Sequence, residues 1–237
     1  MAEAWINVSA LKPKLASFFG ARRNDLGLFG STVNQVFEAF VFAQVISWYQ
    51  KLPGWQVELV NPGPVKSSST ANHVRLKFST RGKPVNYTHA KCVSPNGEVF
   101  QIRHQLRVAT RYHKVGASPP ANLCLDVAVI ADSALDGFSS RDYLRNSLLV
   151  SFGEAKHMSA FAELIAGFVG VVHELQPERL KRVRVDHFKS SPHPAPFLYV
   201  SGYLWNTAEG VRQTLMRRKV DLDIYTRAMP MSLTPNL

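Results

Sequence analysis

The sequence predicts an α/β protein with a mixed central sheet flanked by helices. Two runs, 122–131 (NLCLDVAVIA) and 148–157 (LLVSFGEAKH), are almost wholly apolar and have the length of a strand, which is typical of strands buried on both faces. Helical patterns lie before and after these runs, at 32–51 and 159–175, and both carry broad apolar surfaces. Apolar strands between such helices favour a layered α/β architecture.

The helix expected at 32–51 begins with a capping box, because Thr32 is followed three residues later by Gln35. It is apolar almost all round, so we expect it to pack on more than one side. Glu38 belongs to its one polar stripe. This position is compatible with a solvated helix carboxylate or with a side chain turned toward a functional site.

Further strands and one more helix are predicted by alternating or apolar patterns. The expected strands are 55–60, 74–78, 99–110, 179–189, 197–205 and 220–226, and the additional helix is 206–218. In the second of these strands, Arg75 and Lys77 should face solvent. The chain has no internal repeat and no clean linker. We therefore expect one domain over 1–237, with an N-terminal extension at 1–30 and a flexible tail at 228–237.

The chain is strongly basic: 28 Lys and Arg stand against 17 Asp and Glu, a formal net charge of +11. The basic residues are spread over several segments and not along one amphipathic helix, which favours nucleic acid over a membrane surface. A simpler alternative is that the charge only keeps the protein soluble. No signal-peptide pattern and no membrane-spanning run occur, and Cys92 and Cys124 predict reduced thiols. We therefore expect a soluble cytoplasmic protein.

Two carboxylates and a lysine stand inside the two apolar runs. Glu154 and Lys156 are two residues apart and so project from the same face of a strand, while Asp126 has no basic neighbour in sequence. Charges on core strands are costly unless they pair with one another or hold a cation. A divalent metal ion with a lysine beside it would satisfy all three side chains.

A lone Asp followed on the next strand by Glu-x-Lys resembles the PD-(D/E)xK nuclease superfamily, which has the restriction-endonuclease-like fold. Here the motif consists of Asp126 and Glu154-Ala155-Lys156, and Leu125 stands where the superfamily's name has proline. Many members add a helical glutamate, for which Glu38 is suitably placed. The resemblance covers 32–175 and implies an αβββαβ core, with an additional C-terminal strand-helix-strand.

The resemblance also implies hydrolysis of phosphodiester bonds with Mg²⁺, or Mn²⁺ in its place, because hard oxygen ligands suit these ions. Asp126 and Glu154 would be the metal ligands, together with the Ala155 carbonyl. Lys156 would orient the attacking water or stabilise the transition state. Glu38 would hold the metal through water or bind a second ion.

We therefore expect a metal-dependent DNA endonuclease, of the kind used in restriction or phage defence, acting as a homo-oligomer or with a partner subunit. Basic side chains on two of the expected strands are the candidate phosphate contacts: Arg103 and Arg107, which share a polar face with Gln101 and Gln105, and Arg182 and Arg184. An equally supported alternative is that these side chains only solvate the sheet or serve a protein interface.

Three other functions stay open at this point. In the first, the three charges form a buried salt-bridge cluster in a catalytically inactive, nuclease-like, nucleic-acid-binding subunit of a larger complex. In the second, the nuclease acts on RNA. The third, a nucleotide-binding α/β enzyme, is disfavoured because the sequence has no G-x-G-x-x-G, no P-loop and no G-x-S-x-G nucleophile motif.

Overall fold

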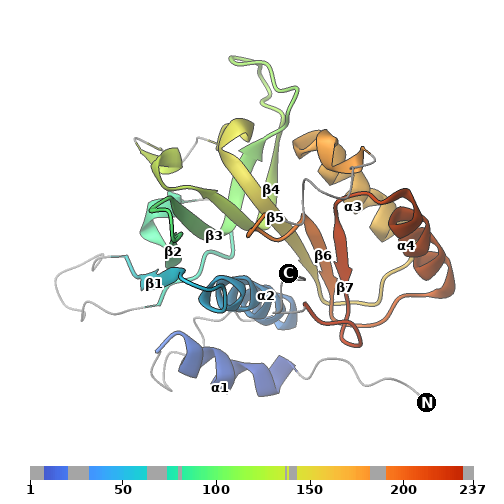
Figure 1. The fold of residues 1–237 in the computed structure, drawn as a ribbon, viewed down its shortest axis with the longest axis horizontal. Helices are drawn as coiled ribbons and strands as arrows, with labels where there is room; N and C mark the ends of the chain where they lie inside the picture. The colour runs from blue at the N-terminus through green and yellow to red at the C-terminus, as the bar shows by residue number, and fades with distance from the viewer. Residues whose placement is uncertain are drawn as a thin grey trace.

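The computed structural model describes residues 8–20, 32–62, 74–79, 82–136, 138, 143–181 and 191–231 (Figure 1). Its helices are α1 (Val8–Phe18), α2 (Val33–Gln50), α3 (Ala162–Leu175) and α4 (Asn206–Arg218). Its strands are β1 (Gln56–Val60), β2 (His89–Val93), β3 (Val99–Ala109), β4 (Asn122–Ala131), β5 (Leu149–Lys156), β6 (Phe197–Val200) and β7 (Asp223–Tyr225). Short 3₁₀ turns are η2 (Pro84–Asn86), η3 (Asp132–Leu135), η4 (Asn146–Leu148) and η5 (Pro177–Leu180).

Within the described residues, seven strands form one mixed sheet in the order β1 to β7. From β1 to β5, each strand is antiparallel to the one before it. β5, β6 and β7 run parallel to one another. Parallel neighbours need a crossover connection, which α3 supplies between β5 and β6 and α4 between β6 and β7. The α/β class expected from the sequence is therefore confirmed.

The helices cover both faces of the sheet. Figure 1 shows α1 and α2 on one side and α3 and α4 on the other. Each side has its own apolar core: one unites α1 and α2 with one sheet face, and the other unites α3 and α4 with the opposite face. We call these the α2-side core and the α3-side core. None of the helices in the described ranges is both long and apolar enough to cross a membrane.

The capping box predicted for α2 is present. The Gln35 backbone N–H donates to the Thr32 hydroxyl, and the Thr32 N–H donates to the Gln35 side-chain oxygen, both at 3.3 Å. The helix is buried on several sides because it lies between the sheet and α1. Leu15 of α1, and Phe19 just after α1, belong to the same core. This packing accounts for the nearly continuous apolar sequence of α2.

Side-chain alternation reverses in the middle of both β3 and β4. On β3, Ile102 packs in the α2-side core, whereas Leu106 packs in the α3-side core, although even-numbered residues of a regular strand share one face. Gln105 lies between them and has a left-handed backbone, with φ 54°. The register is the same on both sides of this point, but Gln105 and the residue opposite it, Asp126, form no ladder pair.

Three details of the predicted fold were wrong. Residues 74–78 are irregular, and the strand beside β3 is β2, which the sequence did not suggest. Lys77 is buried, because its ammonium donates to the carbonyls of Gln105 (2.7 Å) and Ser79 (2.6 Å). Met231, in the predicted tail, is buried in the α2-side core.

The predicted N-terminal extension, 1–30, contains α1, which belongs to the α2-side core. Part of another prediction cannot be compared with the structure. Most of the strand expected at 179–189 lies outside the described residues, and its first two residues end η5.

Candidate active site

The three charged residues of the two apolar strands converge where β4 and β5 separate. The last paired residues of these strands are Val127 and Gly153. One position further, the Asp126 carboxylate accepts the Ala155 backbone N–H at 2.9 Å, so a side chain satisfies a donor that the ladder no longer pairs. The Lys156 ammonium lies 3.0 Å from Asp126 Oδ2 and 2.8 Å from Glu154 Oε2, and thus bridges both carboxylates.

The helical glutamate joins this cluster through a side chain that the sequence analysis had not assigned to the site. The Gln105 side-chain amide donates to Glu38 Oε2 at 3.1 Å and to Asp126 Oδ1 at 2.8 Å. The structure thus brings together all four predicted catalytic residues and adds Gln105. Nothing in the local sequence indicates a left-handed residue here, since Gly and Asn, the usual residues of that conformation, are absent from β3.

Two carboxyl groups of the cluster, those of Glu38 and Glu154, hold their protons more tightly than free carboxyls. Burial, and next the charge of Asp126, raise the pKa of Glu38 to about 7 and that of Glu154 to about 7. Burial alone would lower the pKa of Lys156, but the attraction of Glu154 and Asp126 outweighs it and raises that pKa. The one ammonium of Lys156 therefore does not fully neutralise the negative charge of the carboxylates, and the cluster can accept further positive charge.

The donor set fits a hard divalent cation in its chemistry. Asp126 and Glu154 offer carboxylate oxygens, and Mg²⁺ usually takes only one or two protein carboxylates and keeps several waters. Among the described residues, no group of three or more His, Cys, Asp or Glu side chains is arranged to hold a metal ion. A site here would therefore rest on two carboxylates, the Ala155 carbonyl and water.

A buried polar layer lies behind the cluster. His104 packs between the rings of Phe42 and Phe78, with its Nε2 3.6 Å from Glu38 Oε2. Burial lowers the pKa of His104 to about 4, so the ring is neutral near pH 7. The Cys124 thiol donates to the Gln105 side-chain oxygen at 3.2 Å and completes the contacts of that amide.

The structure describes two of the four predicted phosphate contacts. Arg103 is only 4% exposed, and its guanidinium donates to the Gln101 side-chain oxygen and to the Pro84 carbonyl. The turn η2 therefore takes up this charge inside the fold, which argues against a phosphate contact. Arg107 is half-buried and lies beyond the reversal at Gln105, so it does not share a face with Arg103. Arg182 and Arg184 lie outside the described residues.

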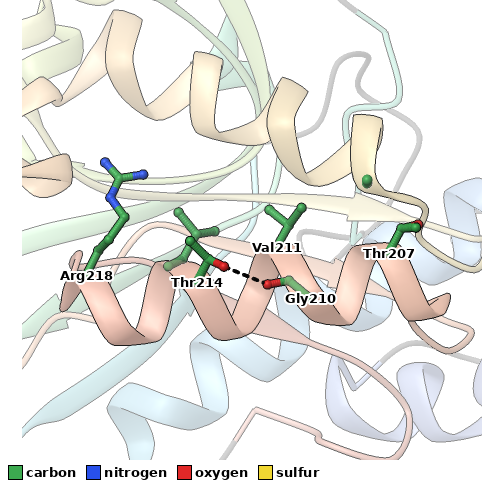
Figure 2. Close-up of a pocket in the computed structure, with 7 residues that line it drawn as sticks. Thr207, Gly210, Val211, Thr214 and Arg218 are labelled. Carbon is green, nitrogen blue, oxygen red and sulfur yellow. Dashed lines mark hydrogen bonds between the residues drawn. The ribbon is translucent and has the colours of Figure 1, made fainter.

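Two surface hollows lie apart from the carboxylate cluster. Figure 2 shows the first, a groove of about 360 Å³ along α4, where the Thr214 hydroxyl donates to the Gly210 carbonyl at 2.9 Å. Its lining is largely apolar, with Arg218 at one end. The second hollow, of about 640 Å³, lies at the end of β3. None of the four clustered catalytic candidates lines either hollow.

Comparisons with protein-family models, curated proteins and solved structures gave no match for this chain.

Proposed function

We propose that this protein is a Mg²⁺-dependent endonuclease of the PD-(D/E)xK type that hydrolyses phosphodiester bonds of DNA. The observation that carries the proposal is the convergence of Asp126, Glu154 and Lys156 at the point where β4 and β5 separate. A carboxylate pair with an adjacent ammonium, partly buried and not fully compensated, is suited to metal-assisted attack on a phosphodiester.

The order of the elements supports the restriction-endonuclease-like core. After α2 and the strands β1 and β2 come the antiparallel strands β3, β4 and β5, then α3 and β6, which is parallel to β5. Without β1 and β2, the order is that of the expected core. This succession corresponds to αβββαβ. β1 and β2 extend the antiparallel edge, and α4 with β7 would be the additional C-terminal elements.

Each side chain has a role that follows from its contacts. Asp126, Glu154 and the Ala155 carbonyl would hold the Mg²⁺, which when bound would neutralise charge developing on the phosphoryl group and make water a better nucleophile. Lys156 stays charged near pH 7, so its ammonium can donate to a water molecule or to a phosphoryl oxygen. Glu38, with a pKa of about 7, can accept a proton at neutral pH.

DNA is the proposed substrate because the chain carries a net charge of +11 while its cluster is acidic. A basic exterior attracts the polyanion, and the carboxylates would need a cation before a phosphate could approach them. One observation favours a second candidate, an inactive DNA-binding module. Lys156 already bridges Asp126 and Glu154, and such a closed salt bridge is compatible with a purely structural cluster.

Cleavage of supercoiled plasmid, with and without Mg²⁺, separates these candidates. The wild type should nick or linearise the plasmid only with Mg²⁺ or Mn²⁺. Asp126→Ala, Glu154→Ala and Lys156→Ala should each lose activity by a factor of 10² or more, on the order expected for removing one such group, while still binding DNA. Glu38→Ala should lose less, because Gln105 lies between Glu38 and Asp126.

Metal binding has its own readout. Mg²⁺ should raise the melting temperature of the wild type but not that of Asp126→Ala, because only the folded carboxylate pair binds the ion. A folded wild type that binds DNA, shows no shift with Mg²⁺ and never cuts plasmid would leave the inactive module as the better description.

A further inference from the structure

The hollow of about 640 Å³ at the end of β3 has a basic and polar lining. We call it the β3-end pocket and define it by its lining residues Ala109, Thr110, Arg111, His113, Val115, Tyr143, Arg145, Asn146 and Ser147. Two of these carry guanidinium groups, Arg111 and Arg145, which come from two separate segments, one after β3 and one before η4. No carboxylate is among these described lining residues, so the charged groups of the lining itself are all positive.

A tyrosine hydroxyl in the pocket is held as a hydrogen-bond donor. The Ala121 backbone N–H donates to His113 Nδ1 at 3.2 Å, so the ring proton of His113 belongs on Nε2. That Nε2 lies 2.6 Å from the Tyr143 hydroxyl and therefore donates to it. The hydrogen of Tyr143 then points away from His113 and can be donated to a ligand. Two arginines and such a hydroxyl are the groups that bind phosphate oxygens.

The pocket is close to the carboxylate cluster along the same strand. Ala109 follows Gln105 by four residues on β3, which corresponds to about 13 Å or roughly the rise of four base pairs of duplex DNA. The loop after β3 projects beyond the sheet in Figure 1 and exposes Tyr112 (67%) and Val115 (90%) beside the basic residues. Exposed aromatic and basic side chains together are common in surfaces that bind nucleic acid.

One acidic side chain competes for this charge. Glu178, in η5, reaches Arg111 with 3.6 Å between its Oε2 and the Arg111 Nη1, and both side chains are about half exposed. An exposed pair of this kind contributes little to stability, so a phosphate can replace Glu178 at low cost.

We infer that the β3-end pocket binds a backbone phosphate of the DNA whose phosphodiester lies at the Asp126–Glu154–Lys156 cluster. This inference rests on the proposed function. The buried Arg103 does not provide a substrate contact, and we assign that contact to the loop after β3 and to Arg145. Arg111 and Arg145 neutralise the phosphate, and Tyr143 donates a hydrogen bond to it.

Binding of a short labelled DNA duplex over a salt series, without divalent cations, tests the inference. Each phosphate contact contributes about 0.9 to the slope of log K against log salt. Because both arginines contact one phosphate, the Arg111→Gln/Arg145→Gln variant should weaken binding to all sequences and flatten the slope by about one unit. Tyr143→Phe should weaken binding with little change in slope. Glu178→Gln should tighten binding, because it releases Arg111.

A charge-matched control removes two exposed lysines from the helices on the other side of the sheet. The variant Lys14→Ala/Lys51→Ala loses the same charge but should keep nearly the wild-type slope. Melting temperatures of all variants show whether each is folded, and Glu178→Gln gives a gain that an unfolded protein could not produce.

The outcomes distinguish the pocket from the proposed function. An unchanged slope in the double arginine variant, with a wild type that binds and cuts DNA, would overturn the pocket and leave the nuclease. A flattened slope with a wild type that binds but never cuts would support the pocket and overturn the nuclease. A wild type that does not bind DNA would overturn both.

Discussion

Gln105 combines a strained backbone with a central place among the catalytic candidates. A residue other than glycine with φ 54° inside a strand costs about 1–3 kcal/mol. Contacts on both sides of the residue oppose this cost: the buried Lys77 ammonium donates to its carbonyl, and its side-chain amide donates to Glu38 and Asp126. The strain aims the amide at two carboxylates, which a regular strand would not do.

The strain predicts an inverted order of stability for two substitutions. In a regular strand glycine is less stable than alanine, but at a positive φ the order reverses. Gln105→Gly should therefore be more stable to urea than Gln105→Ala, by about 1 kcal/mol. Both variants should lose plasmid cleavage, because both lack the amide. Equal stabilities, or a more stable alanine variant, would contradict the left-handed conformation.

At the scale of elements, β5 carries Glu154 and Lys156 of the cluster and joins the antiparallel strands of the sheet to the parallel ones. Gly153 lies opposite Phe197 of β6. A Cβ added at Gly153 would approach the Phe197 ring to 2.0 Å, so this position in β5 has no room for a side chain. The close approach seats the phenyl ring over the strand, one residue before Glu154.

A double-mutant cycle tests that packing. Gly153→Ala should cost on the order of 1–3 kcal/mol by overpacking, and Phe197→Ala about 3–5 kcal/mol by leaving a cavity. The double variant should cost clearly less than the sum, because the new methyl group enters the space that the ring leaves. Gly167→Ala in α3 is the control: its Cβ meets nothing within 4 Å and should stabilise the helix slightly. Additive costs in the cycle would refute the contact.

The elements with strong local signals could be predicted from sequence, and those set by tertiary contacts could not. The capping box located α2, and the apolar runs located β4 and β5, because these patterns follow from burial alone. β2 was missed although buried and half-buried residues alternate along it, because a run of five residues is a short signal. The segment 74–78 alternates like a strand, yet its lysine turns inward to carbonyls that the sequence cannot reveal.

The residues of the candidate site also divide into those that could be predicted from sequence and those that could not. Asp126, Glu154 and Lys156 could be named in advance because charges inside apolar strands are costly and thus conspicuous. Gln105 could not, since its role depends on a backbone reversal without a sequence signal. The burial of Arg103 was equally hidden, because the turn that covers it comes from nineteen residues earlier in the chain.

On the scale of the whole molecule, two sets of buried groups have opposite effects on the free energy of unfolding as the pH falls. Burial lowers the pKa of His89, His104 and His193 to about 4. Each histidine therefore contributes stability that is present above its unfolded pKa of about 6.5 and is lost as the pH falls toward 4. Glu38 and Glu154, with pKa values of about 7, act in the opposite direction. Their folded forms bind protons more tightly than the unfolded chain, so stability rises as the pH falls from 7 toward 4.5.

Removing the two carboxyl groups should therefore make the protein more sensitive to acid. In a chelator and at fixed ionic strength, Glu38→Gln/Glu154→Gln should be more stable to urea than the wild type at pH 8, by on the order of a few kcal/mol. That advantage should shrink steadily to pH 5, because the wild-type carboxyls become protonated while the histidines continue to destabilise both proteins. A control with the same change at the exposed Glu98 and Glu163 should follow the wild type.

Adding Mg²⁺ to the same urea experiment gives a second comparison of the two proteins. The ion binds only deprotonated carboxylates, so it should stabilise the wild type at pH 8, stabilise it much less at pH 5, and leave the double glutamine variant almost unaffected. A variant whose stability runs parallel to the wild type at every pH would mean that burial beside Asp126 does not hold protons on Glu38 and Glu154. The charge imbalance on which a metal site depends would then be absent from the folded protein.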